Sequence, residues 1–140
     1  MVNTVLHEIP PAELGFTLMH EHLFCSDWVK RACWPGYLNE TAALDSICAV
    51  VLRAKRAGVN TIVDATPPNL GRDVSILREV SYRTSMHIIA STGSYCTEDK
   101  WLERISEDGL YYLFMQEVEE GMQGFGCKPG VIKCATDAPE

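Results

Sequence analysis

Short apolar runs alternate along this chain with longer amphipathic stretches, and this alternation restricts the possible folds more than any other feature. The runs have the length and β-branched content of buried strands, whereas the stretches between them repeat apolar residues with a helical period. The pattern predicts strands over residues 15–20, 59–65, 87–92 and 130–136, and helices over 41–57, 73–84 and 107–121. Strands separated by helices pair in parallel through right-handed crossovers, so the sequence predicts an α/β fold with a parallel sheet.

The helix over 41–57 shows this pattern most clearly. Asn39 or Thr41 can cap its start, and Gly58 provides its stop. Its apolar residues keep the i, i+3, i+4, i+7, i+8 spacing of one buried helix face: Leu44, Ile47, Cys48, Val51 and Leu52.

Two segments lie outside the predicted strands and helices. Residues 2–9 are predicted to form an extended lead-in, which a pair of prolines ends. Residues 24–39 are predicted to be a long connection. Its Trp28 and Trp34 are expected to cover the body of the protein rather than contact a ligand.

Length and charge limit the classes of protein that fit. The chain has 140 residues and 46% hydrophobic residues, which suits one domain with a real core. Its net charge of −7, without a basic run, argues against nucleic acid or an anionic membrane surface as a partner. No apolar run reaches the roughly 18 residues of a membrane span, and no signal peptide is recognisable at the N-terminus.

The cysteine pattern favours a reducing compartment. None of the six cysteines forms a Cys-x-x-Cys pair. Cys48 and Cys134 fall inside a predicted helix and a predicted strand, where a reduced thiol behaves as a small buried hydrophobe. A cytoplasmic protein is therefore expected rather than a disulfide-stabilised secreted one.

Two architectures satisfy the strand and helix order: a small doubly wound sheet, or part of an eight-stranded barrel. In both, functional side chains gather at the carboxyl ends of the strands. The side chains there that can carry chemistry are those of His20, His22, Asp64, Tyr95 and Lys133.

The two histidines stand at the end of the first strand, where Phe16 and Leu18 fit a buried segment. Side chains two residues apart on a strand point to the same face, so the imidazoles of His20 and His22 leave this end together. Histidine is the commonest metal ligand, and zinc accepts it readily. Because a catalytic zinc takes about three protein ligands, further ligands must come from elsewhere.

Four sequence blocks stand at or just after the predicted strands: GFTLMHEHL at 15–23, VDATPPNLGRD at 63–73, IIASTGSY at 88–95 and GVIKCATD at 130–137. Together, and in this order, they resemble the phosphotriesterase family of the amidohydrolase superfamily. That family includes the phosphotriesterase-related proteins and the phosphotriesterase-like lactonases. The resemblance covers nearly the whole chain.

The resemblance implies a (β/α)8 TIM barrel with two divalent metals, usually zinc, at its carboxyl end. His20 and His22 match the histidines that hold the more buried metal, and Lys133 matches the lysine that bridges both metals as an N-carboxylate. A free lysine ammonium has no lone pair, so only this modification makes it a ligand. In the family, a metal-bridging hydroxide attacks the substrate, and Tyr95 matches a position that lines the pocket in lactonase-like members.

The chain departs from the family in its length. The remaining family ligands belong to the fifth, sixth and eighth strands, and a barrel of this class needs roughly 200 residues or more. His7 lies in the lead-in, and His87 starts its strand at the end away from the site. The chain is therefore expected to be one partial hydrolase domain over residues 1–140: the N-terminal half of a barrel, with about four β/α units.

These features predict a zinc-dependent hydrolase of phosphotriester, lactone or carboxylic ester bonds, with a small-molecule substrate and self-association into a homo-oligomer. The isolated chain is expected to have little or no activity. Two alternatives stay open. One is a non-catalytic half-barrel that acts as an interaction module, and the other is a Schiff-base lyase that uses Lys133, against which the paired histidines argue.

Other polar residues allow two interpretations. Glu21 points away from the histidine face by alternation. Asp64 either orients a ligand or stabilises a strand end, and Tyr95 either lines a pocket or packs. Arg72 and Asp73 are expected to form a helix-start pair, with the carboxylate favoured by the helix dipole.

Overall fold

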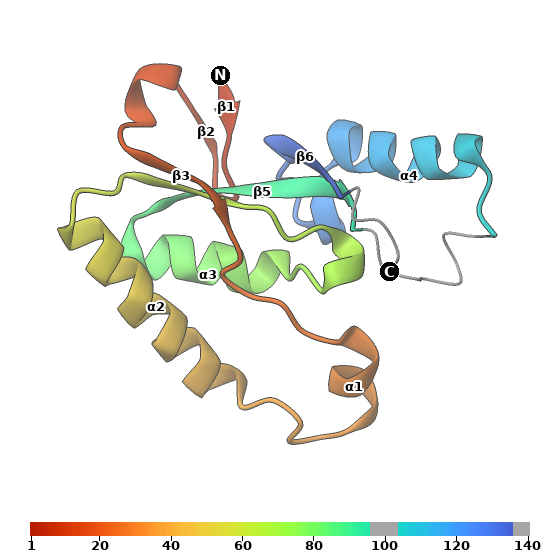
Figure 1. The fold of residues 1–140 in the computed structure, drawn as a ribbon, viewed down its shortest axis with the longest axis horizontal. Coiled ribbons are helices and arrows are strands. Elements are labelled where there is room, and N and C mark those ends of the chain that lie inside the picture. The colour runs from red at the N-terminus through yellow and green to blue at the C-terminus, as the bar shows by residue number, and fades with distance from the viewer. Residues whose placement is uncertain (96–103, 136–140) are drawn as a thin grey trace.

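A parallel sheet of four strands organises the molecule, as seen in a computed structural model that describes residues 1–95 and 104–135. In spatial order the strands are β3 (Thr17–Glu21), β4 (Thr61–Asp64), β5 (His87–Ser94) and β6 (Val131–Cys134). Spatial order follows chain order and every pair is parallel, so each connection crosses over to the next strand. The curled sheet in Figure 1 is half of a TIM barrel, which confirms the predicted fold class.

Helices and short turns connect the strands. The α-helices are α1 (Trp28–Cys33), α2 (Glu40–Arg56), α3 (Val74–Thr84) and α4 (Glu107–Glu120). The 3-10 turns are η1 (Pro11–Glu13), η2 (Pro68–Leu70) and η3 (Met122–Gly124), and an antiparallel hairpin of β1 (Val2–Asn3) and β2 (Glu8–Ile9) precedes the sheet. Among the described residues, no helix has the length and apolar character needed to cross a membrane.

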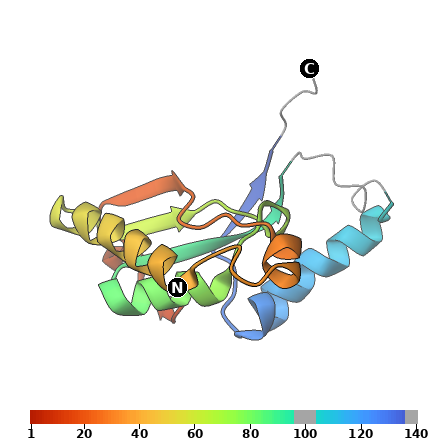
Figure 2. The same cartoon turned by 90° about the horizontal axis from the view of Figure 1, so that it is seen from below.

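The core lies between one face of the sheet and helices α2 and α3, which contact each other and diverge at an angle (Figures 1 and 2). The helix α2 buries Leu44, Cys48 and Val51 against it, three members of the predicted apolar face. Helix α3 and the strands complete the same cluster with Val74, Ile76, Leu77, Val80, Ile62, Ile88 and Ala90.

Side-chain caps begin the helices close to the predicted positions. The amide of Ala42 donates to the side chain of Asn39, so Asn39 rather than Thr41 caps α2. Asp73 caps α3 by accepting from the amides of Ser75 and Ile76. The predicted helix starts are therefore confirmed.

The connection over residues 24–39 contains a helix that the sequence prediction missed. Helix α1 has 6 residues, and the amide of Lys30 donates to its cap Asp27. A helix this short makes too few hydrogen bonds to be stable in isolation and depends on tertiary contacts. Its apolar pattern is correspondingly weak in the sequence.

The expectation of buried strand residues is wrong at the two edge strands. Phe16, just before β3, is 64% exposed, and Ile132 in β6 is 71% exposed. Cys134 is also exposed, whereas Cys48 is buried as predicted. A strand residue is covered only if a neighbouring element lies over it, and β3 and β6 each have a neighbour on one side only.

Helix α4 extends past the carboxyl end of β5 (Figure 1). The predicted apolar stripe over 107–121 does form a helix, yet none of its described residues is buried, and Tyr111 is 66% exposed. Met122, in the turn that follows, does reach the core.

Candidate active site at the carboxyl end of the sheet

The curl of the sheet brings His20, His22 and Lys133 together. His20 lies in β3, His22 follows the end of this strand, and Lys133 lies in β6, at the opposite edge of the sheet. The Nζ of Lys133 lies 3.4 Å from the Nε2 of His20, although these residues are 113 positions apart. The ring centroids of His20 and His22 are 5.3 Å apart. Both imidazoles are exposed to solvent, and Lys133 is half-buried.

The buried carboxylate of Asp64 forms a hydrogen bond with the segment that follows the histidines. Asp64, at the end of β4, is fully buried and accepts hydrogen bonds from the amides of Leu23 (2.8 Å) and Thr66 (3.0 Å). Burial raises the pKa of the Asp64 carboxyl above its ordinary value, although hydrogen bonds from Thr66 and Leu23 oppose this rise. Of the two predicted roles for Asp64, these contacts support stabilisation of a strand end.

Thr66, whose amide donates to this carboxylate, also contacts one of the candidate ligands. Its Oγ1 lies 2.9 Å from the Nδ1 of His22 and 3.6 Å from the Sγ of Cys25. Sequence analysis missed Thr66. The signal available was its position two residues after Asp64, just beyond the carboxyl end of a strand.

Tyr95 follows β5 and is half-buried. Its amide donates to the side chain of Asn69 (2.8 Å), whose Nδ2 donates to the Tyr95 carbonyl (2.9 Å). These bonds join the end of β5 to η2. A cavity of about 350 Å³ opens next to them, lined by residues that include Asn69, Ser94 and Phe114.

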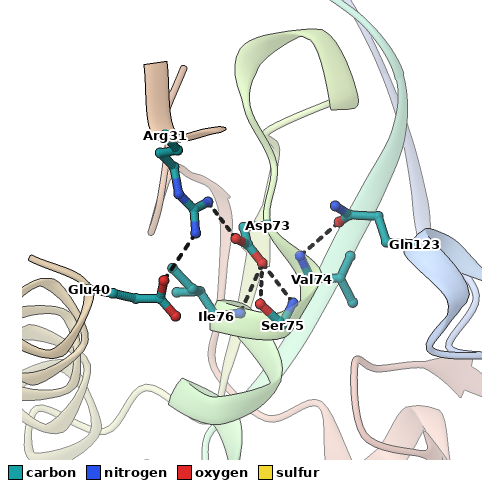
Figure 3. Close-up of polar contacts among 7 residues, drawn as sticks. All are labelled: Arg31, Glu40, Asp73, Val74, Ser75, Ile76 and Gln123. Atoms are coloured by element: carbon teal, nitrogen blue, oxygen red, sulfur yellow. Dashed lines mark hydrogen bonds and ion pairs between the residues drawn. The ribbon is translucent and has the colours of Figure 1, made fainter. Parts of the chain in front are cut away.

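A second polar cluster, shown in Figure 3, holds the first connection in place. The Nη1 of Arg31 in α1 lies 2.6 Å from the Oδ2 of Asp73, and its Nη2 lies 3.3 Å from Glu40. Burial alone raises the pKa of the Asp73 carboxyl, but hydrogen bonds from Ser75, Arg31 and Ile76 outweigh it, so this pKa lies below its ordinary value. The cluster therefore anchors α1 to the starts of α2 and α3.

Arg72 differs from its predicted role in a helix-start pair. Its side chain is only 2% exposed, and its Nη1 donates to the carbonyl of Ser91 (2.6 Å). The guanidinium also forms an ion pair with Glu117 of α4. Arg72 thus links β5 to α4, whereas Asp73 makes the predicted cap.

The other two histidines lie at the opposite end of the molecule. His87 starts β5, as predicted, and its ring centroid is 6.4 Å from that of His7. Neither ring belongs to the candidate site.

The donor set fits a metal only if Lys133 is modified. Within residues 1–95 and 104–135, no three His, Cys, Asp or Glu side chains are grouped so as to hold a metal ion. His20 and His22 supply two donors, and Lys133 stands beside them. N-carboxylation of this lysine would add an oxygen donor at the same place, and the three side chains would then form a set of histidine and carboxylate ligands.

Four parallel strands in chain order, with the candidate residues gathered at their carboxyl ends, define the N-terminal half of a TIM barrel. The chain belongs to the phosphotriesterase family, whose sequence model matches residues 1–140.

Known relatives extend beyond the region that matches this chain. An aryldialkylphosphatase of Saccharolobus solfataricus is 38% identical over 134 residues, which cover 94% of this chain and 42% of that protein. A phosphotriesterase homology protein of Mycobacterium tuberculosis is 33% identical, over 99% of this chain and 45% of that protein. This chain therefore spans less than half the length of these relatives.

A solved structure shows the same arrangement. A double mutant of the organophosphorus hydrolase from Deinococcus radiodurans superimposes with a TM-score of 0.79 at 35% identity, over 94% of this chain and 42% of that chain. A phospho-furanose lactonase of Mycoplasmopsis agalactiae is a further relative, 30% identical over 94% of this chain and 39% of that protein. By name, these relatives include an aryldialkylphosphatase, an organophosphorus hydrolase and a phospho-furanose lactonase.

Proposed function

We propose that this chain supplies part of the active site of a zinc-dependent hydrolase that acts on phosphotriester, lactone or carboxylic ester bonds. The observation that carries the proposal is the 3.4 Å approach of Lys133 Nζ to His20 Nε2, across a sheet whose outer strands they occupy. A lysine that only reached for solvent would not need to face an imidazole in this way. The names of the relatives support the class of substrate.

His20, His22 and Lys133 each have a proposed role as a metal ligand. His20 and His22 present imidazole nitrogens from one strand end, and N-carboxylated Lys133 presents an oxygen from β6. A bound zinc lowers the pKa of coordinated water to about 7 and polarises the ester, so a nucleophile is available at neutral pH. Tyr95 and the adjoining cavity are proposed to contact the substrate.

Metal content of the purified chain tests this proposal. We expect about one zinc per chain after equilibration with zinc and bicarbonate, because the three donors suit a single weak site. The His20→Ala/His22→Ala variant should hold no zinc, since it lacks both imidazoles. Elemental analysis after gel filtration measures the ratio, and lactones and phosphotriesters are then tested as substrates.

The His7→Ala/His87→Ala variant is the matched control, because it removes two histidines from the opposite end. It should retain the zinc of the unmodified chain. Equal zinc in the chain and in the His20→Ala/His22→Ala variant would contradict the proposed site.

The exposed edges of the sheet favour a second candidate function, that of an interaction module. Met19 in β3 is 65% exposed and Ile132 in β6 is 71% exposed. Unpaired edge strands with apolar side chains promote association with another chain. In this candidate function the half-barrel binds a second copy of itself through these edges, with or without turnover.

Light scattering during gel filtration measures this association. We expect the chain to elute with a mass above its monomer mass of 15.6 kDa, and Met19→Lys/Ile132→Lys to elute nearer the monomer. Tyr82→Lys is the control, because Tyr82 is 74% exposed on α3, away from both edges. A monomeric unmodified chain would exclude this candidate.

A further inference from the structure

A second pocket gathers basic side chains at the end of the molecule opposite the candidate active site. This cavity of about 270 Å³ lies where the β1–β2 hairpin, helix α3 and the segment before β6 meet. Each of these parts contributes one basic side chain to its lining: His7 from the hairpin, Arg78 from α3 and Lys128 from the segment before β6. Glu8 is the acidic side chain of the lining, so the pocket has more basic than acidic groups.

The two permanent cations of this pocket have no carboxylate partner. Neither the half-buried Arg78 nor the exposed Lys128 forms an ion pair within the part of the chain that the structure describes. Burial raises the pKa of the neighbouring Cys127 thiol, so the sulfur stays uncharged and does not neutralise Arg78. A partly buried charge without a partner is costly, and an anion from outside the chain would compensate it.

Hydrogen bonds fix the walls of the pocket. The Nη1 of Arg78 donates to the carbonyl of Val5 in the hairpin (2.5 Å), and the guanidinium carbon lies 5.5 Å from the ring centroid of Phe125. The Nδ2 of Asn3 donates to the carbonyl of Pro129 (3.1 Å), which joins the hairpin to the segment before β6. Donors that are held in place before binding lose less conformational freedom when a ligand arrives.

We propose that this pocket binds the phosphoryl group of a small anion, either inorganic phosphate or a phosphate monoester. The planar donor fork of Arg78 matches phosphate oxygens, and Lys128 adds a point charge. Because the donors come from three separate parts of the chain, a tetrahedral anion can accept from more of them than a planar carboxylate can. The volume lies below the roughly 300–1,000 Å³ of pockets for drug-sized ligands, which suits a small ion.

Titration of the metal-free chain with inorganic phosphate at low ionic strength tests the proposal. In ¹⁵N–¹H spectra we expect saturable shifts at the amides of His7, Arg78 and Lys128. Methyl phosphate, as a second probe, distinguishes the two sources of the phosphoryl group: similar affinity indicates that a monoester fits, and much weaker binding indicates inorganic phosphate. Acetate that binds as tightly as phosphate would overturn the assignment to a phosphoryl group.

Three variants identify the side chains responsible. Lys128→Gln should weaken phosphate binding about 2–5-fold, as expected for an exposed charge. Arg78→Gln should weaken it about tenfold or more, because Arg78 donates charged hydrogen bonds from a half-buried position. Arg56→Gln is the matched control, because Arg56 is an exposed cation at the end of α2 without an ion pair among the described residues. It changes the net charge as much as Lys128→Gln does, but it should leave the affinity unchanged.

Three results would overturn the proposal. The first is the absence of saturable shifts at the pocket, and the second is an equal loss of affinity in Arg56→Gln and Lys128→Gln. The third is a set of shifts confined to the surroundings of His20 and His22, which would place the phosphate at the candidate active site. Lys128→Gln keeps the proposal testable if Arg78→Gln does not fold, since Lys128 is exposed and its side chain makes no hydrogen bond among the described residues. Zinc content is measured separately, so failure here leaves the proposed hydrolase site unaffected.

Discussion

Replacing Arg72 by alanine is expected to lower the free energy of unfolding by about 3–5 kcal/mol, because it removes one partner of a buried ion pair. Arg72 is 2% exposed and Glu117 is 18% exposed, so the glutamate is left with little access to water. The carbonyl of Ser91 also loses its donor at 2.6 Å. Urea denaturation followed by circular dichroism measures the loss.

Arg83→Ala is the control for the general effect of losing an arginine. Arg83 pairs with Glu79 at 2.6 Å and with Asp45 at 3.2 Å, but its side chain is 42% exposed. An exposed pair of this kind contributes about 0–1 kcal/mol. If Arg72→Ala and Arg83→Ala lower the free energy of unfolding by similar amounts, burial does not make the Arg72 ion pair more important for stability than an exposed pair.

The pair Arg72→Met/Glu117→Leu distinguishes an unpaired charge from a lost packing contact. It removes both charges and retains apolar volume, and such replacements are often neutral or stabilising. We expect most of the stability lost in Arg72→Ala to return. If the double variant is as unstable as Arg72→Ala, the void and not the lone carboxylate accounts for the loss.

Local patterns were sufficient to predict most of the secondary structure. The apolar spacing in α2 identified Leu44, Cys48 and Val51, which are buried. Asn39 and Asp73 were recognisable as caps because their side chains bond to amides only two or three residues away. Interactions over such short separations leave a signal in the sequence itself.

Features that depend on distant partners could not be predicted in this way. Helix α1 is held by Arg31, whose partner Asp73 is 42 residues further along the chain. The exposure of Phe16 and Ile132 depends on which elements lie next to the edge strands, and their apolar character alone does not reveal it. Periodicity identifies a face of a strand but not what covers it.

In the candidate site, too, local features could be predicted from the sequence and contacts between distant residues could not. The spacing of His20 and His22 predicts that their rings are neighbours, and the ring centroids lie 5.3 Å apart. The approach of Lys133 follows from the curl of the sheet and was expected only through the family resemblance. Thr66 was missed because a threonine carries no chemical signal until its partners are known.

Replacing Gly93 by alanine is expected to lower the free energy of unfolding by roughly 3 kcal/mol or more, since it combines backbone strain with a collision. Gly93 has a φ of +107°, which alanine rarely adopts, and an added Cβ would lie 2.1 Å from the carbonyl oxygen of Lys133. Gly93 is also the register partner of Lys133. The substitution therefore forces β5 and β6 apart and moves Lys133, so zinc binding should weaken together with stability.

Gly58→Ala separates the two contributions. Gly58 has a φ of +98°, but a Cβ there would meet nothing within 4 Å, so this variant has the strain without the collision. We expect it to lose about 1–2 kcal/mol and to bind zinc as the unmodified chain does. If both glycine variants lose the same stability in urea denaturation, β6 can move away from β5 at little cost. The position of Lys133 would then depend on contacts other than its pairing with Gly93.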